Sequence, residues 1–313
     1  MLLSDDLFSK AFGVNLFQIF LIYALFGSIF SVGKIAIAAS QPYFLTSIRM
    51  LLAGGCILGY LFLKNRSSLR VSRELWKLLI LVALFNVFIT NAFEFWGLQY
   101  MNAGKTCLIY SLSPFAAAFF AYISGTETMT PKKCWGLAIG MLAFCPMMLE
   151  PWMNGTHNDV NLTELLAEGA LLISAITCVI GWHYFKRLTI SHQVPDAVVN
   201  GYSFLIAGIM CLLPSFMFEH WNPVPVTLWT DFIWTLLYIV ITHNLICYSI
   251  YAASLHRFSI TFMTFAGLSN PLFAGLFGWL FLGEQISLSF IIALVGISAG
   301  LVIFSRDEQR QIA

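Results

Sequence analysis

The amino-acid sequence predicts an all-α polytopic membrane protein of ten transmembrane helices, arranged as two inverted-topology repeats of five helices. Three observations support this prediction: the composition, the length of the apolar runs, and an alignment of the two halves of the chain. The 313 residues are 59% hydrophobic and 10% charged, whereas soluble domains carry roughly 25% charged residues. This composition excludes a soluble enzyme, a nucleic-acid-binding protein and a disordered chain.

The apolar residues fall into ten runs separated by prolines, glycines and charged residues. A bilayer core of about 30 Å needs about 20 apolar residues of helix. Nine runs approach or exceed that length, and the fifth is short. The predicted spans cover residues 15–38, 44–63, 76–98, 104–123, 134–150, 165–185, 198–218, 232–252, 259–282 and 286–304.

The placement of lysine and arginine predicts that both termini are cytoplasmic. With that orientation, 13 of the 16 basic residues fall in inner segments, and the outer loops carry acidic residues but no lysine or arginine. Cytoplasmic loops of membrane proteins show this excess of basic residues. The predicted cytoplasmic ends are residues 1–14 and 305–313, and residues 151–164 form an outer linker. The short loops favour a bacterial inner membrane.

An internal repeat relates the two halves. Residues 103–130 align with residues 260–287 without a gap, at a constant offset of 157. The alignment places Ser113-Pro114 on Asn270-Pro271, so prolines interrupt the fourth and ninth helices at the same point. Because five is an odd number, the second half must enter the membrane from the opposite side, as in many secondary transporters. The predicted repeats cover residues 15–150 and 165–304.

Several motifs resemble the EamA domain of the drug/metabolite transporter superfamily, and the resemblance spans both repeats. They are Phe26-Gly27-Ser28-Ile29-Phe30, Arg49-Met50-Leu51-Leu52-Ala53-Gly54, Ala103 through Pro114, and Phe281-Leu282-Gly283-Glu284-Gln285. The first half departs from the pattern because Thr126-Glu127 replaces the glycine-glutamate pair. The resemblance implies ten helices, inverted repeats and alternating access around a central cavity.

Polar residues within the apolar runs indicate a binding site at mid-membrane. In the third helix, Asn86, Thr90 and Glu94 are four residues apart and therefore share one helix face. The repeat offset places Asn86 on His243 and Glu94 on Tyr251, so both faces are expected to line one cavity. The candidate substrate-binding residues are Ser28, Lys34, Asn86, Thr90, Asn91, Glu94, Lys105, Tyr110, Ser113, Trp182, His243, Asn244, Tyr248, Tyr251 and Asn270.

Charged side chains at membrane depth leave two interpretations open, since they are costly there and usually face a bundle interior or a cavity. Lys34, Arg49 and Lys105 either extend to the outer interface or pack between the halves, or they belong to the site. Glu94 either balances one of these cations, or binds an ammonium group or a coupling proton. Rings such as Trp182 either fill the core, or stack on a planar base and attract a cation.

The motifs favour a secondary transporter over an enzyme or a channel. Gly267-Leu268-Ser269-Asn270 lacks the last glycine of a rhomboid-type G-x-S-G motif, no H-E-x-x-H motif occurs, and the seven cysteines form no C-x-x-C pair. We therefore expect no cofactor, no metal and no nucleic-acid partner. The expected partners are the lipid bilayer and a small metabolite. Coupling to protons is left open, as is the choice between a monomer and a homodimer.

The expected substrate is a small polar, zwitterionic metabolite. The candidate residues combine cations, a carboxylate, amides and aromatic rings, which suits an amino acid or an amino-acid-bearing metabolite such as S-adenosylmethionine. Substrate is expected to bind between helices one, three and four and helices six, eight and nine, by exchange or proton coupling. The alternatives are efflux of drugs or hydrophobic cations, nucleotide-sugar-like anion exchange and, outside transport, an intramembrane enzyme.

Overall fold

The computed structural model describes residues 16–101, 106, 109–110, 112–125, 128–153, 162–273 and 288–312, and these form helices and their connections. Among the described residues, six helices are long and apolar enough to cross a membrane: Gln18–Ala39, Pro42–Lys64, Arg73–Tyr100, Leu165–Ser191, Asp196–Phe218 and Trp229–Leu255. Two shorter apolar helices are Ser113–Ser124 and Ile291–Phe304. The chain is an all-α polytopic membrane protein, as its composition predicts.

The first half contains α2 (Leu16–Ala39), α3 (Pro42–Lys64), α4 (Trp76–Val82), η3 (Ala83–Ile89), α5 (Thr90–Tyr100), α7 (Ser113–Ser124) and α8 (Pro131–Met153). Two short 3₁₀ turns, η1 (Arg66–Leu69) and η2 (Arg73–Leu75), connect α3 to α4. Prolines occupy the first turns of α3 and α7, where the missing N–H group costs no hydrogen bond. Gly125 ends α7 with a φ of 59°, a left-handed conformation that glycine adopts readily.

The second half repeats this order. It contains α9 (Leu162–Lys186), η4 (Arg187–Ser191), α10 (Asp196–Phe218), α11 (Trp229–Ile239), η5 (Val240–Cys247), α12 (Tyr248–Leu255), α13 (Ile260–Ala266), η6 (Gly267–Ser269) and α15 (Leu288–Ile312). The predicted ninth span extends beyond the described residues after Phe273, and the predicted fourth span is described as a helix mainly from Ser113 onward.

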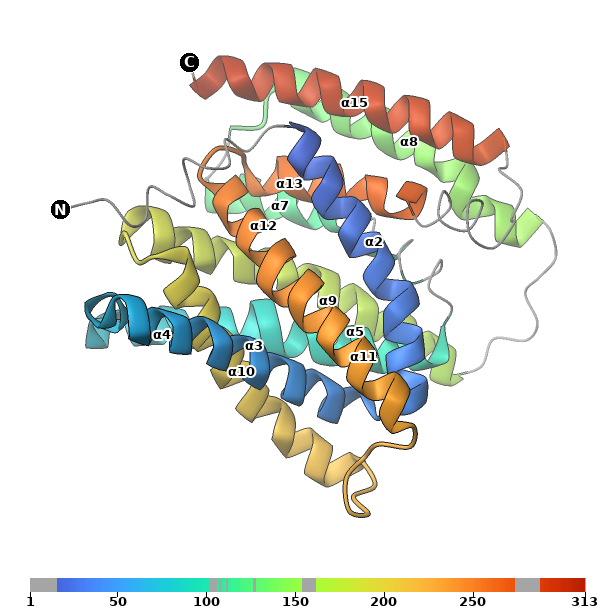
Figure 1. The fold of residues 1–313 in the computed structure, drawn as a ribbon. Coiled ribbons are helices and arrows are strands. Elements are labelled where there is room, and N and C mark those ends of the chain that lie inside the picture. Colours follow the sequence, from blue (N-terminus) through green and yellow to red (C-terminus); the bar gives the residue numbers. More distant parts are fainter. Residues whose placement is uncertain are drawn as a thin grey trace.

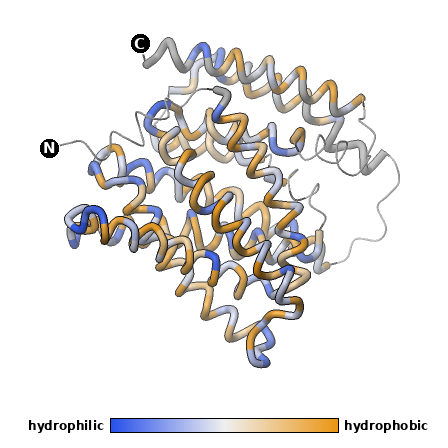
Figure 2. Tube along the Cα trace, in the orientation of Figure 1, coloured by the Kyte–Doolittle hydropathy of each residue, from blue (hydrophilic) through white to orange (hydrophobic). Residues whose placement is uncertain are grey.

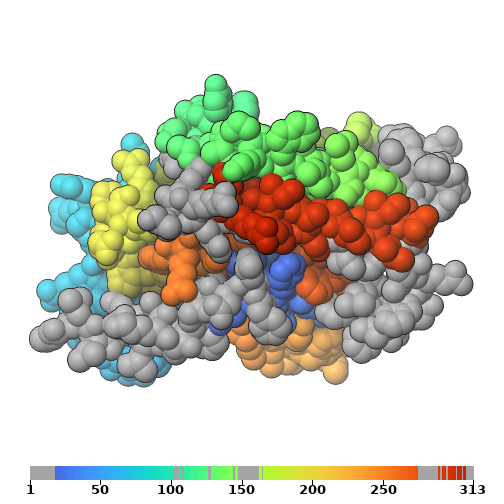
Figure 3. Space-filling model, turned by 90° about the horizontal axis from the view of Figure 1, so that it is seen from above, coloured from blue at the N-terminus to red at the C-terminus, as the bar shows by residue number. Residues whose placement is uncertain are grey.

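The packing of the helices has the two-fold pattern expected of an inverted repeat (Figure 1). Helix α8 packs along α15, α3 along α10, and α7 against α13. Further contacts join α2 to α11 and α12, and α5 to α9. Numbered as the ten predicted spans, these pairs are 5 with 10, 2 with 7, 4 with 9, 1 with 8, and 3 with 6. If each span is replaced by its equivalent in the other repeat, the same set of pairs results. Figure 3 shows α8 and α15 side by side across one face.

Small residues bring two of these symmetric pairs into close contact. A Cβ atom added at Gly54 of α3 would lie 2.8 Å from the carbonyl oxygen of Gly201 on α10. One added at Gly136 of α8 would lie 2.9 Å from the carbonyl oxygen of Gly300 on α15. Helices in membranes associate through such small residues, because lipid provides no hydrophobic driving force between them.

The third and eighth helices each contain a π-helical segment at equivalent positions. The segment η3 begins at Ala83 and η5 begins at Val240, which are 157 residues apart, the offset of the sequence repeat. Asn86 and His243, which the alignment superposes, lie within these segments. π-Helical turns inside α-helices are rare, and those that occur are often at functional sites, so this pair makes the middle of both helices a candidate functional region.

Hydrophilic residues gather at the helix ends and loops of the bundle (Figure 2). At one end, which we call the basic end, α3 finishes at Lys64 and α9 at Lys186, and Asp196 accepts a hydrogen bond from His256 at 3.0 Å. At the opposite end, the Glu219 carboxylate accepts a hydrogen bond from the backbone N–H of Tyr43 at 2.6 Å. That contact satisfies the first turn of α3.

Candidate functional site

A cavity of about 110 Å³ lies at mid-length in the bundle. Its wall comes from α2, α5, the residues before and at the start of α7, α9, η5 with α12, and α13 with η6 and Asn270. These are the helices between which the sequence analysis expects substrate. Its wall consists of Tyr23, Phe26, Ile29, Phe30, Thr90, Asn91, Glu94, Tyr110, Ser113, Cys178, Val179, Trp182, His243, Tyr248, Tyr251, Thr264, Gly267 and Asn270.

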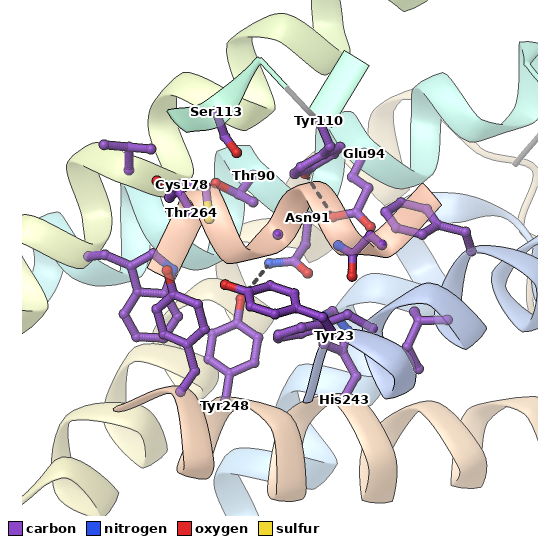
Figure 4. A pocket seen from close by; sticks show the side chains of 18 residues that line it. Tyr23, Thr90, Asn91, Glu94, Tyr110, Ser113, Cys178, His243, Tyr248 and Thr264 are labelled. Carbon is purple, nitrogen blue, oxygen red and sulfur yellow. Dashed lines mark hydrogen bonds between the residues drawn. The ribbon is translucent and has the colours of Figure 1, made fainter. Parts of the chain in front are cut away.

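One side of the cavity is polar and is centred on Glu94 (Figure 4). The Tyr110 hydroxyl donates a hydrogen bond to Glu94 Oε2 at 2.9 Å and also contacts the hydroxyl of Ser174 on α9. The Ser174 hydroxyl in turn donates to the carbonyl of Thr90 at 2.7 Å. Within the described part of the wall, Glu94 is the acidic residue and neither lysine nor arginine is present. This side therefore offers one carboxylate to a ligand.

The other side of the cavity is aromatic. The rings of Trp182 and Tyr251 stack with centroids 4.3 Å apart, and the Tyr248 ring lies 5.4 Å from Trp182. The Tyr23 hydroxyl hydrogen-bonds to the carbonyl of Met263. These rings are buried; Trp182 lies four residues before the end of α9 at Lys186, and Tyr251 lies four residues before the end of α12 at Leu255. They therefore separate the cavity from the basic end.

Side chains of the cavity wall bind the backbone of the π-helical segment η3. Thr90 Oγ1 donates to the carbonyl of Phe85 at 2.7 Å, and Asn91 Nδ2 donates to the carbonyl of Val87 at 2.7 Å. The Tyr248 hydroxyl, from the other repeat, lies 3.5 Å from the carbonyl of Asn86. A backbone carbonyl in a membrane needs an internal hydrogen-bond partner. A ligand that drew Thr90, Asn91 or Tyr248 toward itself would therefore take a partner from a carbonyl of η3.

Arg49 lies directly behind the cavity wall and links the two repeats. Its side chain is completely buried. Nη2 donates to Asn91 Oδ1 at 2.6 Å, and Nη1 lies 3.0 Å from His243 Nδ1. The guanidinium carbon stands 4.3 Å from the centre of the Phe95 ring. Of the three readings for Arg49, extension to the outer interface is wrong and packing between the halves is confirmed, and Arg49 is not among the described residues of the cavity wall.

The structure brings most of the candidate residues together. Those on the cavity wall are Thr90, Asn91, Glu94, Tyr110, Ser113, Trp182, His243, Tyr248, Tyr251 and Asn270. Ser113 and Asn270, which the repeat superposes, both contribute to the wall beside their prolines. Lys105 lies outside the described residues, so its expected role stays a prediction.

Four candidates lie off the wall, each with another partner. Asn86 Nδ2 donates to the carbonyl of Cys178 at 3.3 Å, and Asn244 Nδ2 lies 3.1 Å from Met50 Sδ. The Ser28 hydroxyl hydrogen-bonds to the Tyr238 hydroxyl at 2.7 Å, and Lys34 Nζ lies 3.5 Å from the carbonyl of Gln99. Asn86 does not share a helix face with Thr90, because the two are four residues apart and one turn of a π-helix takes more than four residues.

The sequence analysis named none of the four wall residues contributed by α2. Tyr23, Phe26, Ile29 and Phe30 line the cavity, but they stand among apolar residues, so no polar neighbour distinguishes them from lipid-facing residues. Cys178 did carry a signal, because it lies four residues before Trp182 and therefore shares its helix face.

The cavity is smaller than a metabolite requires. Ligand pockets usually have volumes of about 300–1,000 Å³, and the cavity has about 110 Å³. A ligand of metabolite size would therefore fit only if the surrounding helices moved apart. Among the residues that the structure describes, no three His, Cys, Asp or Glu side chains form a group able to hold a metal ion.

Comparison with known proteins shows to which family the chain belongs. The model of the EamA-like transporter family matches residues 14–149 and 165–306. This chain belongs to the EamA-like transporter family. The transporter also resembles a crystal structure that covers 95% of this chain and 97% of its own, with a TM-score of 0.72 and 16% sequence identity. That likeness concerns the fold, and it agrees with the ten-helix inverted-repeat fold of the family.

Curated relatives extend the comparison along nearly the whole transporter. A protein of Chlamydia trachomatis serovar L2 named S-adenosylmethionine/S-adenosylhomocysteine transporter is 35% identical, over 97% of this chain and 93% of its own. A protein of the same name from Chlamydia muridarum is 36% identical, over 95% and 93%. The uncharacterized transporter YoaV of Bacillus subtilis is 23% identical, over 86% and 88%. The resemblance to the EamA domain is thus confirmed.

Proposed function

We propose that this transporter exchanges S-adenosylmethionine for S-adenosylhomocysteine across a bacterial inner membrane. The observation that carries the proposal is the cavity, which places the Glu94 carboxylate across from a group of aromatic rings. The names of the chlamydial relatives, at 35% and 36% identity over nearly the whole chain, support the same substrates.

The chemistry of S-adenosylmethionine matches both sides of the cavity. Its adenine is a planar base, and rings such as Trp182 can stack on it. Its sulfonium and ammonium groups are cations, which aromatic faces and the Glu94 carboxylate attract. S-adenosylhomocysteine keeps the adenine and the ammonium group and lacks only the methyl group on sulfur, so one site can accept both.

The alternatives fit the cavity less well. Efflux of drugs or hydrophobic cations would favour a uniformly apolar wall, yet Thr90, Asn91 and Glu94 lie on it. Exchange of nucleotide-sugar-like anions would favour lysine or arginine on the wall, and its described part has neither.

The proposed cycle is alternating access between the repeats 15–150 and 165–304, joined by the outer linker 151–164. Both termini (1–14 and 305–313) are placed in the cytoplasm because the basic residues gather on that side. The rings of Trp182, Tyr251 and Tyr23 then close the cytoplasmic side, and their separation opens it. A single chain suffices for the site, since helices of one chain enclose the cavity.

Counterflow in proteoliposomes tests the proposal. Vesicles loaded with S-adenosylhomocysteine should take up labelled S-adenosylmethionine several times faster than vesicles loaded with buffer, methionine or adenosine. Glu94→Gln, which keeps the shape and the Tyr110 contact but removes the charge, should lower this uptake more than it lowers the amount of reconstituted protein. Uptake that ignores the internal substrate, or equal losses of rate and protein, would contradict the proposal.

A further inference from the structure

We propose that Arg49 is a positioning residue that keeps His243 uncharged, so that the site admits a cationic substrate over a wide pH range. The inference rests on the proposed function and extends it, because it assigns a role to a residue outside the cavity wall. It starts from the hydrogen bonds of a guanidinium at the junction of the two repeats.

The geometry fixes the protonation state of His243. A guanidinium carries N–H donors and no acceptor, so at 3.0 Å from Arg49 Nη1 the Nδ1 atom of His243 must accept. An imidazole that accepts at Nδ1 carries its proton on Nε2 and is neutral. Protonation of Nδ1 would place two positive charges in contact inside a completely buried site, which is strongly unfavourable.

Among the described residues around His243, no positive charge other than Arg49 opposes protonation of its ring. Arg49 on α3 and Tyr248 on α12 contact it. The other titratable residues of the described cavity wall are Tyr23, Glu94, Tyr110, Cys178 and Tyr251. Tyrosine and cysteine side chains are neutral near pH 7. Glu94 would favour a charged imidazole, whereas the burial of the ring and the contact with Arg49 both oppose it.

A neutral His243 matters because it lies on the cavity wall. A charged imidazole there would repel the sulfonium and ammonium groups of S-adenosylmethionine, and would offset the attraction of Glu94. Arg49 also holds Asn91 at 2.6 Å, so one side chain aligns a wall residue from each repeat. Its own charge stays behind Asn91 and His243, off the described wall.

The test is the pH profile of S-adenosylmethionine counterflow in proteoliposomes, with equal pH on both sides. In Arg49→Met, the positive charge that opposes protonation of His243 Nδ1 is removed, while Glu94 on the same cavity wall still favours it. Uptake should then fall several-fold from pH 7.5 to pH 5.5, relative to the wild-type protein at each pH. S-adenosylhomocysteine, which lacks the sulfonium charge, should lose less.

Two further variants separate positioning from a structural role. Arg49→Lys keeps a positive donor beside His243 and should keep the wild-type pH profile, with a lower maximal rate because one ammonium cannot hold both partners as well. The double variant Arg49→Met with His243→Gln has no imidazole to titrate and should lose the acid sensitivity. A wild-type profile in Arg49→Met, or acid sensitivity that persists in the double variant, would overturn the proposal.

His243→Gln alone provides a measurement that needs no Arg49 variant. If His243 is neutral throughout, this change leaves the shape of the pH profile between 5.5 and 7.5 as in the wild type. If it removes an acid sensitivity that the wild type shows, His243 titrates and the proposal is wrong. Failure of the wild type to take up S-adenosylmethionine at all would instead contradict the proposed function, and this inference with it.

Discussion

Gly181 tests how closely helices three and six must approach to form the site. A Cβ atom added at Gly181 of α9 would lie 2.4 Å from the N, Cα and Cβ atoms of Asn86 in η3. Ordinary van der Waals contact begins at 3.4 Å, so Gly181→Ala must move α9 and η3 apart by about 1 Å. Two of the three contacts are with backbone atoms, so a change of the Asn86 rotamer cannot relieve them.

The expected cost follows from this displacement. Overpacking of a well-packed interior costs about 1–3 kcal/mol, against which alanine gains up to about 1 kcal/mol over glycine in a helix. Gly181→Ala should therefore unfold several degrees below the wild type in a thermal scan in detergent. Because Cys178 and Trp182 on the same helix move with it, counterflow should fall at least tenfold.

Gly169 provides the matched control on the same helix. An added Cβ atom there meets nothing within 4 Å, so Gly169→Ala should leave counterflow unchanged and leave stability equal or slightly higher. Equal stability and equal counterflow in Gly181→Ala and Gly169→Ala would refute the close contact between α9 and η3.

Three further predictions concern a helix end, a pH-dependent contact and the aromatic side. Glu219→Ala removes the acceptor for the Tyr43 N–H and should lower the free energy of unfolding by about 1–2 kcal/mol; Glu219→Gln should lose less in the same thermal scan. The hydrogen bond with Asp196 raises the pKa of His256, so its stabilisation is present below the unfolded value near 6.5 and is lost as the pH rises through the folded value. His256→Gln should thus destabilise the protein more at pH 5.5 than at pH 9, and an equal effect at both values would contradict this. Trp182→Ala should weaken binding of both substrates about tenfold, since stacking on a base contributes about 1–3 kcal/mol, whereas Trp182→Phe should restore most of it in a binding titration.

The fold could be predicted largely from the sequence, because a membrane imposes strong constraints. Long apolar runs must be helices in lipid, and the 157-residue offset relates the two halves. The sequence could not predict the π segments η3 and η5, since an i to i+5 turn leaves no mark in the hydrophobic pattern. These segments change the rotation of the helix, which is why Asn86 leaves the wall while Asn91 joins it.

The site could be predicted only where polar residues interrupt an apolar helix. Thr90, Glu94 and His243 were found in this way, and the repeat supported the choice. Phe26 and Phe30 gave no signal, because aromatic residues face lipid as often as a cavity. The position of Arg49 depends on the packing of α3 against α5 and η5, a tertiary contact that its sequence neighbours do not reveal.

Protection of Cys178 from a thiol reagent tests most directly that substrate occupies this cavity. Cys178 lines the cavity, whereas Cys56 on α3 is exposed on the outer surface of the bundle. In variants that retain only one of these cysteines, saturating S-adenosylhomocysteine should slow modification of Cys178 several-fold and leave Cys56 unaffected. Modification of Cys178 at the same rate with and without substrate would contradict binding between the two repeats.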